Sequence, residues 1–118
     1  MRTPAQTAQR YIDAMNAAEI EEMMSLFTPD AVLRHISGIY TDPEAIRSFF
    51  VEIAFGNAAQ LQPVDLTTDD STAWLEVEAT SSLTPGRQRV VDVFRVDDQG
   101  RIRDLGIYSG NVIPNSEG

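Results

Sequence analysis

The chain has 118 residues with a formal net charge of −9, a single histidine, and neither cysteine nor lysine. This length predicts that residues 1–118 form one domain, and the absence of cysteine excludes disulfides, thiolate metal sites and a cysteine nucleophile. With one histidine we expect no metal centre, and the acidic balance argues against nucleic acids and anionic membranes as partners. Because no apolar run is long enough to span a membrane and the N-terminus lacks the apolar core of a signal peptide, we expect a cytoplasmic location.

Two helices are predicted at the start of the chain. The segment Thr3-Pro4-Ala5-Gln6 supplies an N-cap, a proline at the first helical position and the glutamine of a capping box. Apolar residues that include Tyr11 follow at helical spacing. A second apolar stripe runs from Ile20 to Phe27, and Thr28-Pro29-Asp30 predicts the end of that helix.

A short strand is predicted to carry the only histidine. It runs from Ala31 to Ile36, and alternation places Ala31, Leu33 and His35 on its inner face. A lone histidine on such a face is more often a satisfied core residue than a functional one. After a loop at Ser37-Gly38, a second capping signature at Thr41-Asp42-Pro43-Glu44 predicts a third helix. This helix is expected to end near Gly56-Asn57, with its buried stripe at Ile46, Phe49, Phe50 and Ile53.

The second half of the chain is rich in strand-like segments separated by turn residues. Four strands are predicted: Leu61 to Thr68, Thr72 to Leu83, Arg87 to Val96, and Arg101 to Val112. The turns between them are predicted at Asp69-Asp70-Ser71, Thr84-Pro85-Gly86 and Asp98-Gln99-Gly100. Helices followed by an antiparallel meander indicate an α+β fold, in which the helices cover one face of a curved antiparallel sheet.

The third of these strands places a carboxyl group in an apolar wall. Val90, Asp92, Phe94 and Val96 share one face, whereas the arginines of this strand lie on the other. The face with Asp92 is therefore expected to point inward. A carboxylate there is costly unless it is hydrogen-bonded or protonated. A structural role for Asp92, bonded to backbone N–H groups or to an arginine, stays open on this strand alone.

The chain resembles the ketosteroid isomerase family within the SnoaL-like, nuclear-transport-factor-2-like group. The likeness runs from about Tyr11 to Tyr108, and its clearest motifs are Tyr11-Ile12-Asp13-Ala14-Met15-Asn16 and Asp92-Val93-Phe94-Arg95. The resemblance implies a cone-shaped, cystatin-like curved sheet around the N-terminal helices. It also implies that Tyr11 corresponds to the oxyanion-binding tyrosine, Asp92 to the protonated aspartic acid and His35 to the aspartate base. Phe27 and Phe50 stand where the isomerases often have supporting tyrosines.

The resulting hypothesis is a cofactor-independent isomerase or lyase acting next to a carbonyl group of a steroid, terpenoid or polyketide. His35 would be the base, with Tyr11 and neutral Asp92 as donors to the developing enolate oxygen. Dehydratases of the same group that use Tyr, His and Asp fit equally well, whereas an epoxide hydrolase would need an arginine at the position of Val90. The predicted pocket wall consists of Phe27, Phe49, Phe50, Phe55, Leu83, Phe94, Leu105 and Ile107.

The competing hypothesis is a non-catalytic binder of a small hydrophobic molecule, or a dimeric assembly module of the same fold. Association is suggested by Trp74, Val91 and Val93, which lie on the sheet face away from the helices. An apolar outer face in a small protein predicts a homodimer formed through the sheets.

Overall fold

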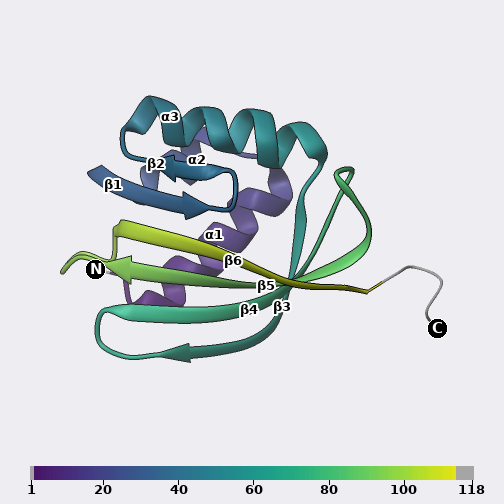
Figure 1. Cartoon of the computed structure of the whole chain (residues 1–118). Helices are drawn as coiled ribbons and strands as arrows, with labels where there is room; N and C mark the ends of the chain where they lie inside the picture. Colours follow the sequence, from purple (N-terminus) through teal and green to yellow (C-terminus); the bar gives the residue numbers. More distant parts are fainter. Residues whose placement is uncertain (1, 114–118) are drawn as a thin grey trace.

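The computed structural model describes residues 2–113 of the chain. Helices cover one face of a curved, unclosed six-stranded sheet (Figure 1), so the predicted α+β class is confirmed. The elements, in chain order, are α1 (Pro4–Ala17), α2 (Ile20–Ser25), β1 (Phe27–His35), β2 (Gly38–Tyr40), α3 (Pro43–Ser48), the π-helix η1 (Phe49–Ala54), the 3₁₀-helix η2 (Phe55–Asn57), β3 (Gln60–Thr68), β4 (Thr72–Ser81), β5 (Thr84–Val96) and β6 (Ile102–Ile113).

The strand order of the sheet is β2-β1-β6-β5-β4-β3. All neighbours are antiparallel except β1 and β6, which run parallel. The sheet was expected to be antiparallel throughout, so this pair is a correction. The parallel direction of this pair could not be predicted from the sequence, because β1 and β6 are joined by three helical segments and four other strands rather than by a hairpin.

Helix α1 lies across the concave face of the sheet, where it packs against β3, β4 and β5 (Figure 1). Its predicted start is confirmed, because Thr3 and Gln6 form a reciprocal capping box. The first turn is fixed to the β5–β6 turn by the buried Thr7 hydroxyl, which donates to the Gly100 carbonyl at 2.6 Å. Gly100 has a φ of +79°, and a Cβ there would overlap the backbone of Arg2, so glycine is required.

Helix α2 is shorter than predicted, because Phe27 begins β1 instead of ending the helix. Phe27 pairs with Ile102, and the next paired residue of β1 is Val32, opposite Asp104. The residues between form a wide irregularity that contains Pro29. Proline has no N–H to donate, so its place is in such a break of the ladder rather than in regular pairing.

Three further boundaries differ from the sequence prediction. The expected loop at Ser37-Gly38 leads directly into the short strand β2, which pairs with β1 through His35 and Gly38. The third helix is α-helical only to Ser48 and continues as the π-helix η1. The β4–β5 turn lies at Ser82-Leu83 and not at Thr84-Pro85-Gly86, because Ser81 already pairs with Thr84. The N-cap of α3 is as predicted, since the Asp42 side chain accepts a hydrogen bond from the Ala45 N–H.

Candidate functional site

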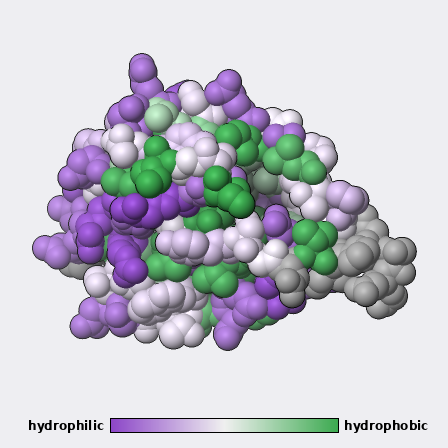
Figure 2. All heavy atoms as spheres, in the orientation of Figure 1, coloured by the Kyte–Doolittle hydropathy of each residue, from purple (hydrophilic) through white to green (hydrophobic). Residues whose placement is uncertain are grey.

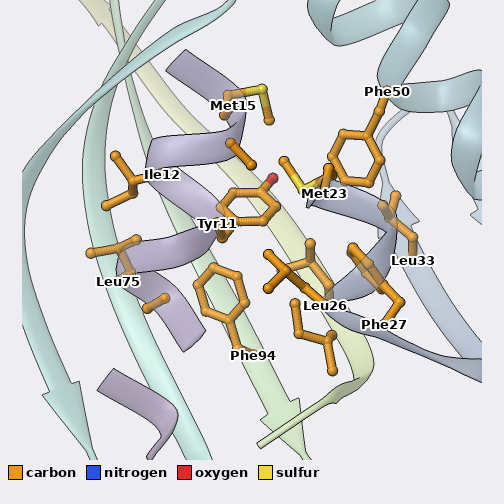
Figure 3. Packing of buried hydrophobic residues seen from close by; sticks show 14 of the residues in the cluster. Tyr11, Ile12, Met15, Met23, Leu26, Phe27, Leu33, Phe50, Leu75 and Phe94 are labelled. Atoms are coloured by element: carbon orange, nitrogen blue, oxygen red, sulfur yellow. The ribbon is translucent and has the colours of Figure 1, made fainter. Parts of the chain in front are cut away.

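Tyr11 projects from α1 into the space between the helix and the sheet and is 1% exposed. Its ring meets Phe94 edge-on at a centroid distance of 5.0 Å and Phe50 at 6.0 Å. Figure 3 shows the ring next to Phe94, with the hydroxyl directed away from it. Among the described residues the hydroxyl has no side-chain partner, and burial together with the charge of Asp92 raises the pKa of Tyr11 well above its usual range. Tyr11 is therefore a neutral hydrogen-bond donor at all physiological pH values.

Asp92 points inward from β5, as the alternation predicts, and is 2% exposed. Its paired neighbours are Leu75 on β4 and Ile107 on β6, so the carboxyl lies between two apolar side chains. No hydrogen bond to this carboxyl is found within residues 2–113. Burial raises the pKa of Asp92 from 3.8 to about 7. The group is thus protonated below neutral pH and readily loses or gains a proton near it.

His35 is the last residue of β1 and is half-buried. Its ring packs edge-on against Phe49 at a centroid distance of 5.0 Å. The Nδ1 atom lies 2.8 Å from the Ser37 hydroxyl oxygen and accepts a hydrogen bond from the Ser37 backbone N–H at 3.1 Å. Burial lowers the pKa of His35, so the imidazole is neutral at pH 7.

The three residues line one cavity of about 120 Å³ between α1, η1 and the sheet. An engineered apolar cavity of roughly 150 Å³ holds one benzene molecule, whereas pockets for drug-sized ligands measure about 300–1,000 Å³. A cavity of this volume therefore suits a single ring. The remaining lining residues are Met15, Phe49, Ile53, Ala54, Ala59, Leu61, Ala79, Thr80, Ser81, Leu83, Gln88, Val90, Ile107 and Ser109.

Of the eight predicted wall residues, Phe49, Leu83 and Ile107 line this cavity. The other five do not. Phe50, Phe94 and Leu105 are 0% exposed and belong to the core under α1, and Phe55 packs against that core from η2. Phe27 borders a separate surface hollow of about 380 Å³ beside α3, which contains none of the three proton-transfer candidates.

Several lining residues were missed by the sequence analysis, although strand alternation already contained the signal. Gln88 and Val90 precede Asp92 at two-residue steps on β5, and Ser109 follows Ile107 by one such step on β6. The pairing of Val90 with Ser109 extends the inner face toward the open end of the sheet. The polar residues there mark the mouth of the cavity.

Residues 2–113 contain no group of three or more His, Asp or Glu side chains placed to hold a metal ion. In the same part of the chain, no helix combines the length and apolarity needed to cross a bilayer.

The comparisons with known proteins agree with this architecture. The family model for the SnoaL-like domain matches residues 8–105. A provisionally named polyketide cyclase from Sinorhizobium meliloti is 22% identical, with 86% of this chain and 92% of that chain covered and a TM-score of 0.79. A provisionally named ketosteroid isomerase from Kribbella flavida is 22% identical, with 95% and 81% covered and a TM-score of 0.78. A computationally designed 17-OHP binder is 16% identical, with 93% of each chain covered and a TM-score of 0.80.

At these identities the structural likenesses establish the fold and leave the activity open. No curated protein matches the chain.

Proposed function

The chain belongs to the SnoaL-like domain family, and on this premise we propose that it is an enzyme that moves a proton next to a carbonyl group of a small hydrophobic molecule without a cofactor. One observation carries the proposal. Tyr11, His35 and Asp92 come from three separate elements and line a single cavity. Tyr11 and Asp92 are almost fully buried, and neither the phenol nor the carboxyl has a hydrogen-bond partner among the described residues, so both groups are free to bind a ligand in the cavity.

The protonation states suit enolate chemistry. Removing a proton next to a carbonyl group develops negative charge on the carbonyl oxygen, and preorganised donors in a dry site stabilise that charge. Tyr11 is a permanent donor because its pKa is raised. His35 and Asp92 are the two groups of the cavity that can exchange a proton near neutral pH. The sequence-based assignment makes His35 the base and protonated Asp92 the second donor.

The cavity and the relatives support a hydrophobic carbonyl compound as the substrate. The walls are largely apolar, and a carbonyl compound of the steroid, terpenoid or polyketide type would bring a ring to the three polar groups. Because the cavity has a volume of about 120 Å³ and is open on one side, one ring of such a molecule would be held between the helices and the sheet, with the rest at the mouth near Leu83 and Ser109. The outcome would be double-bond migration, dehydration or ring closure, as the names of the related isomerase and cyclase suggest.

The test is hydrogen–deuterium exchange at the α-carbon of ketones of increasing size. Cyclopentanone, cyclohexanone, a decalone and a 3-ketosteroid are incubated in D₂O with the protein, and exchange is followed by ¹H NMR. We expect the protein to accelerate exchange, and His35→Ala and Asp92→Ala to reduce it by a factor of about 10²–10⁴. Asp98→Ala, which removes an exposed carboxylate from the end of the same hairpin, is the matched control and should not change it. Exchange that is no faster than in buffer, or is unchanged in both cavity variants, contradicts the proposal.

A second candidate function, ligand binding without catalysis, is favoured by the shared fold of the designed 17-OHP binder. In that case the ketones would bind to the cavity, but their α-protons would exchange at the rate in buffer. Titration of each ketone while the Ile107 and Val90 methyl resonances are observed separates the two candidates, because it detects occupancy of the cavity independently of turnover.

We also propose that two copies associate through the outer face of the sheet. Trp74 is 37% and Tyr108 56% exposed there, next to the half-buried pair Val91 and Val93. Figure 2 shows the molecule from one side, where apolar patches alternate with polar ones and no single continuous apolar area appears. Light scattering at micromolar concentration should give the mass of a dimer, and the mass of a monomer would refute this proposal.

A further inference from the structure

The turn between β1 and β2 determines which nitrogen of His35 carries a proton. A backbone N–H can only donate, and the Ser37 N–H lies 3.1 Å from Nδ1 in hydrogen-bonding geometry. Nδ1 is therefore the acceptor of this bond. A proton on Nδ1 could be donated to the Ser37 hydroxyl oxygen at 2.8 Å, but it would place two N–H donors against each other and break the bond from the Ser37 backbone. The turn therefore disfavours both the Nδ1–H tautomer and the imidazolium form.

Neutral imidazole carries one proton, and with Nδ1 as the acceptor this proton is on Nε2. Nε2 has no hydrogen-bond partner within residues 2–113, and the ring lines the cavity with Phe49 against it. We infer that the β1–β2 turn holds neutral His35 as the Nε2–H tautomer, so that the ring presents a hydrogen-bond donor, and not a base, to the cavity.

Two hydroxyl groups complete this arrangement. The Ser37 hydroxyl lies 2.8 Å from Nδ1 and 2.7 Å from the Tyr40 hydroxyl. The Tyr40 ring packs on Phe49 at a centroid distance of 5.2 Å, and Phe49 also contacts the His35 ring. Ser37 and Tyr40 are therefore positioning residues: the Ser37 backbone N–H sets the tautomer of His35, and the two hydroxyl groups hold the orientation of its ring.

This inference rests on the proposed function and divides the roles within it. The titratable groups that face the cavity are Tyr11 from α1, His35 from β1 and Asp92 from β5, with Tyr40 behind His35 on β2. With His35 and Tyr11 both donating to the carbonyl oxygen, the Asp92 carboxylate is the remaining acceptor. It takes the proton as the α C–H bond breaks, the electron pair moves into the enolate, and the protonated carboxyl returns the proton to a carbon atom. The sequence-based assignment of base and donor is thereby reversed.

The tautomer is tested directly. Because His35 is the only histidine of the chain, its nitrogen resonances need no assignment to a residue, and only Nδ1 and Nε2 have to be told apart. Long-range ¹H–¹⁵N correlation spectra of the ¹⁵N-labelled protein are recorded between pH 5 and 9. We expect a pyridine-type Nδ1 and a pyrrole-type Nε2 at high pH, in the native protein and in Ser37→Ala, which keeps the backbone N–H. A pyrrole-type Nδ1, or averaged shifts for the two nitrogens, would overturn the inference. This measurement does not depend on any activity.

The division of roles is tested by two amide substitutions in the exchange assay. Gln and Asn each donate an N–H but cannot act as a base, so His35→Gln preserves a donor near the position of Nε2, and Asp92→Asn removes the base. We expect Asp92→Asn to lose at least about 100-fold in exchange rate and His35→Gln to lose less than about tenfold, with His35→Leu falling as far as Asp92→Asn. Any other pattern, including equal losses in the two amide variants, contradicts this division. If the native protein exchanges no ketone, the proposed function fails, while the NMR result still decides the tautomer.

Discussion

The two faces of β5 hold charged side chains in opposite ways. On the outer face, Arg89 donates to Glu76 at 2.7 Å and to Glu78 at 2.9 Å, so that each charge has a partner. This pairing lowers the pKa of Glu78. On the inner face, Asp92 lies between apolar neighbours without such a partner among residues 2–113, and burial raises its pKa to about 7. The carboxyl groups of Glu78 on the outer face of β4 and of Asp92 on the inner face of β5 therefore have pKa shifts in opposite directions.

The two terminal nitrogens of Arg89 are occupied by Glu76 and Glu78, whereas its buried Nε has no partner among the described residues. Charges that are paired in this way at a surface have little left to offer a ligand. A buried carboxyl without a partner costs folding free energy, and such a cost is tolerated where the group serves a function. The comparison thus supports the proposal that the inner face of β5, and not its more highly charged outer face, carries the site.

The largest expected effect is the pH dependence of stability due to Asp92. Its pKa is about 7 in the folded protein and 3.8 ordinarily, so the unfolded chain ionises first as the pH rises. The folded state therefore loses stability between about pH 4 and pH 7, by about 4 kcal/mol in total, and the loss is complete above pH 7. Urea unfolding of the native protein and of Asp92→Asn at pH 4, 5.5, 7 and 8 should show a difference that grows through this window.

Glu78→Gln provides the control from the other face. Because the pKa of Glu78 is lowered, its contribution is present above its ordinary pKa and is lost as the pH falls through the folded-state value. The difference between Glu78→Gln and the native protein should therefore have the opposite sign of slope. Equal slopes for the two variants would mean that the two faces do not differ in the way described.

The second prediction concerns Tyr11 and separates activity from stability. Tyr11→Phe removes only a hydroxyl that makes no hydrogen bond to a described residue, while the ring keeps its packing on Phe94 and Phe50. We expect the exchange rate of a bound ketone to fall by a factor of about 10²–10³, the usual consequence of losing one oxyanion donor. The free energy of unfolding should stay the same or rise, because no protein hydrogen bond is lost. A variant that is clearly less stable would show that the hydroxyl has a structural partner.

The third prediction concerns the proposed dimer and changes the outer face alone. Trp74→Glu places a charge in the apolar row formed with Val93 and should raise the dimer dissociation constant by at least about thirtyfold, as expected for a central tryptophan of an interface. Val51→Glu, at an exposed apolar position on η1, is the control and should leave the dissociation constant unchanged. Analytical ultracentrifugation over a concentration series measures both. Equal effects would point to an interface elsewhere.

Much of this comparison could be predicted from the sequence, because strand alternation depends only on local geometry. The inward orientation of Asp92 and Phe94 and the capping of α1 and α3 are examples. The irregularity around Pro29 and the parallel pairing of β1 with β6 could not be predicted, since both depend on contacts between segments far apart in the chain. Such long-range pairing leaves no local pattern.

The wall of the cavity was predicted only in part for a related reason. Strand alternation predicts that Phe94, Leu105 and Ile107 point inward, but it does not predict which part of the inner face is covered by α1. Phe94 lies directly under Tyr11 of α1 and is core, whereas Ile107 lies farther along the sheet and faces the cavity. The Ser37 contact with His35 was missed because the turn was predicted as a loop without pairing.

The smallest expected effect belongs to the outer ion pairs themselves. Arg89→Met keeps the apolar stem of the side chain on the sheet and removes both bonds to Glu76 and Glu78. Surface ion pairs contribute little and are screened by salt, so the change in unfolding free energy should be a small fraction of that expected for Asp92. It should disappear in about 1 M NaCl, where the Debye length is only about 3 Å. The rate of ketone α-proton exchange should equal that of the native protein both at low salt and in about 1 M NaCl. A loss of exchange in Arg89→Met would show that the outer network supports the inner site, and the two faces of β5 would then have to be treated as one functional unit.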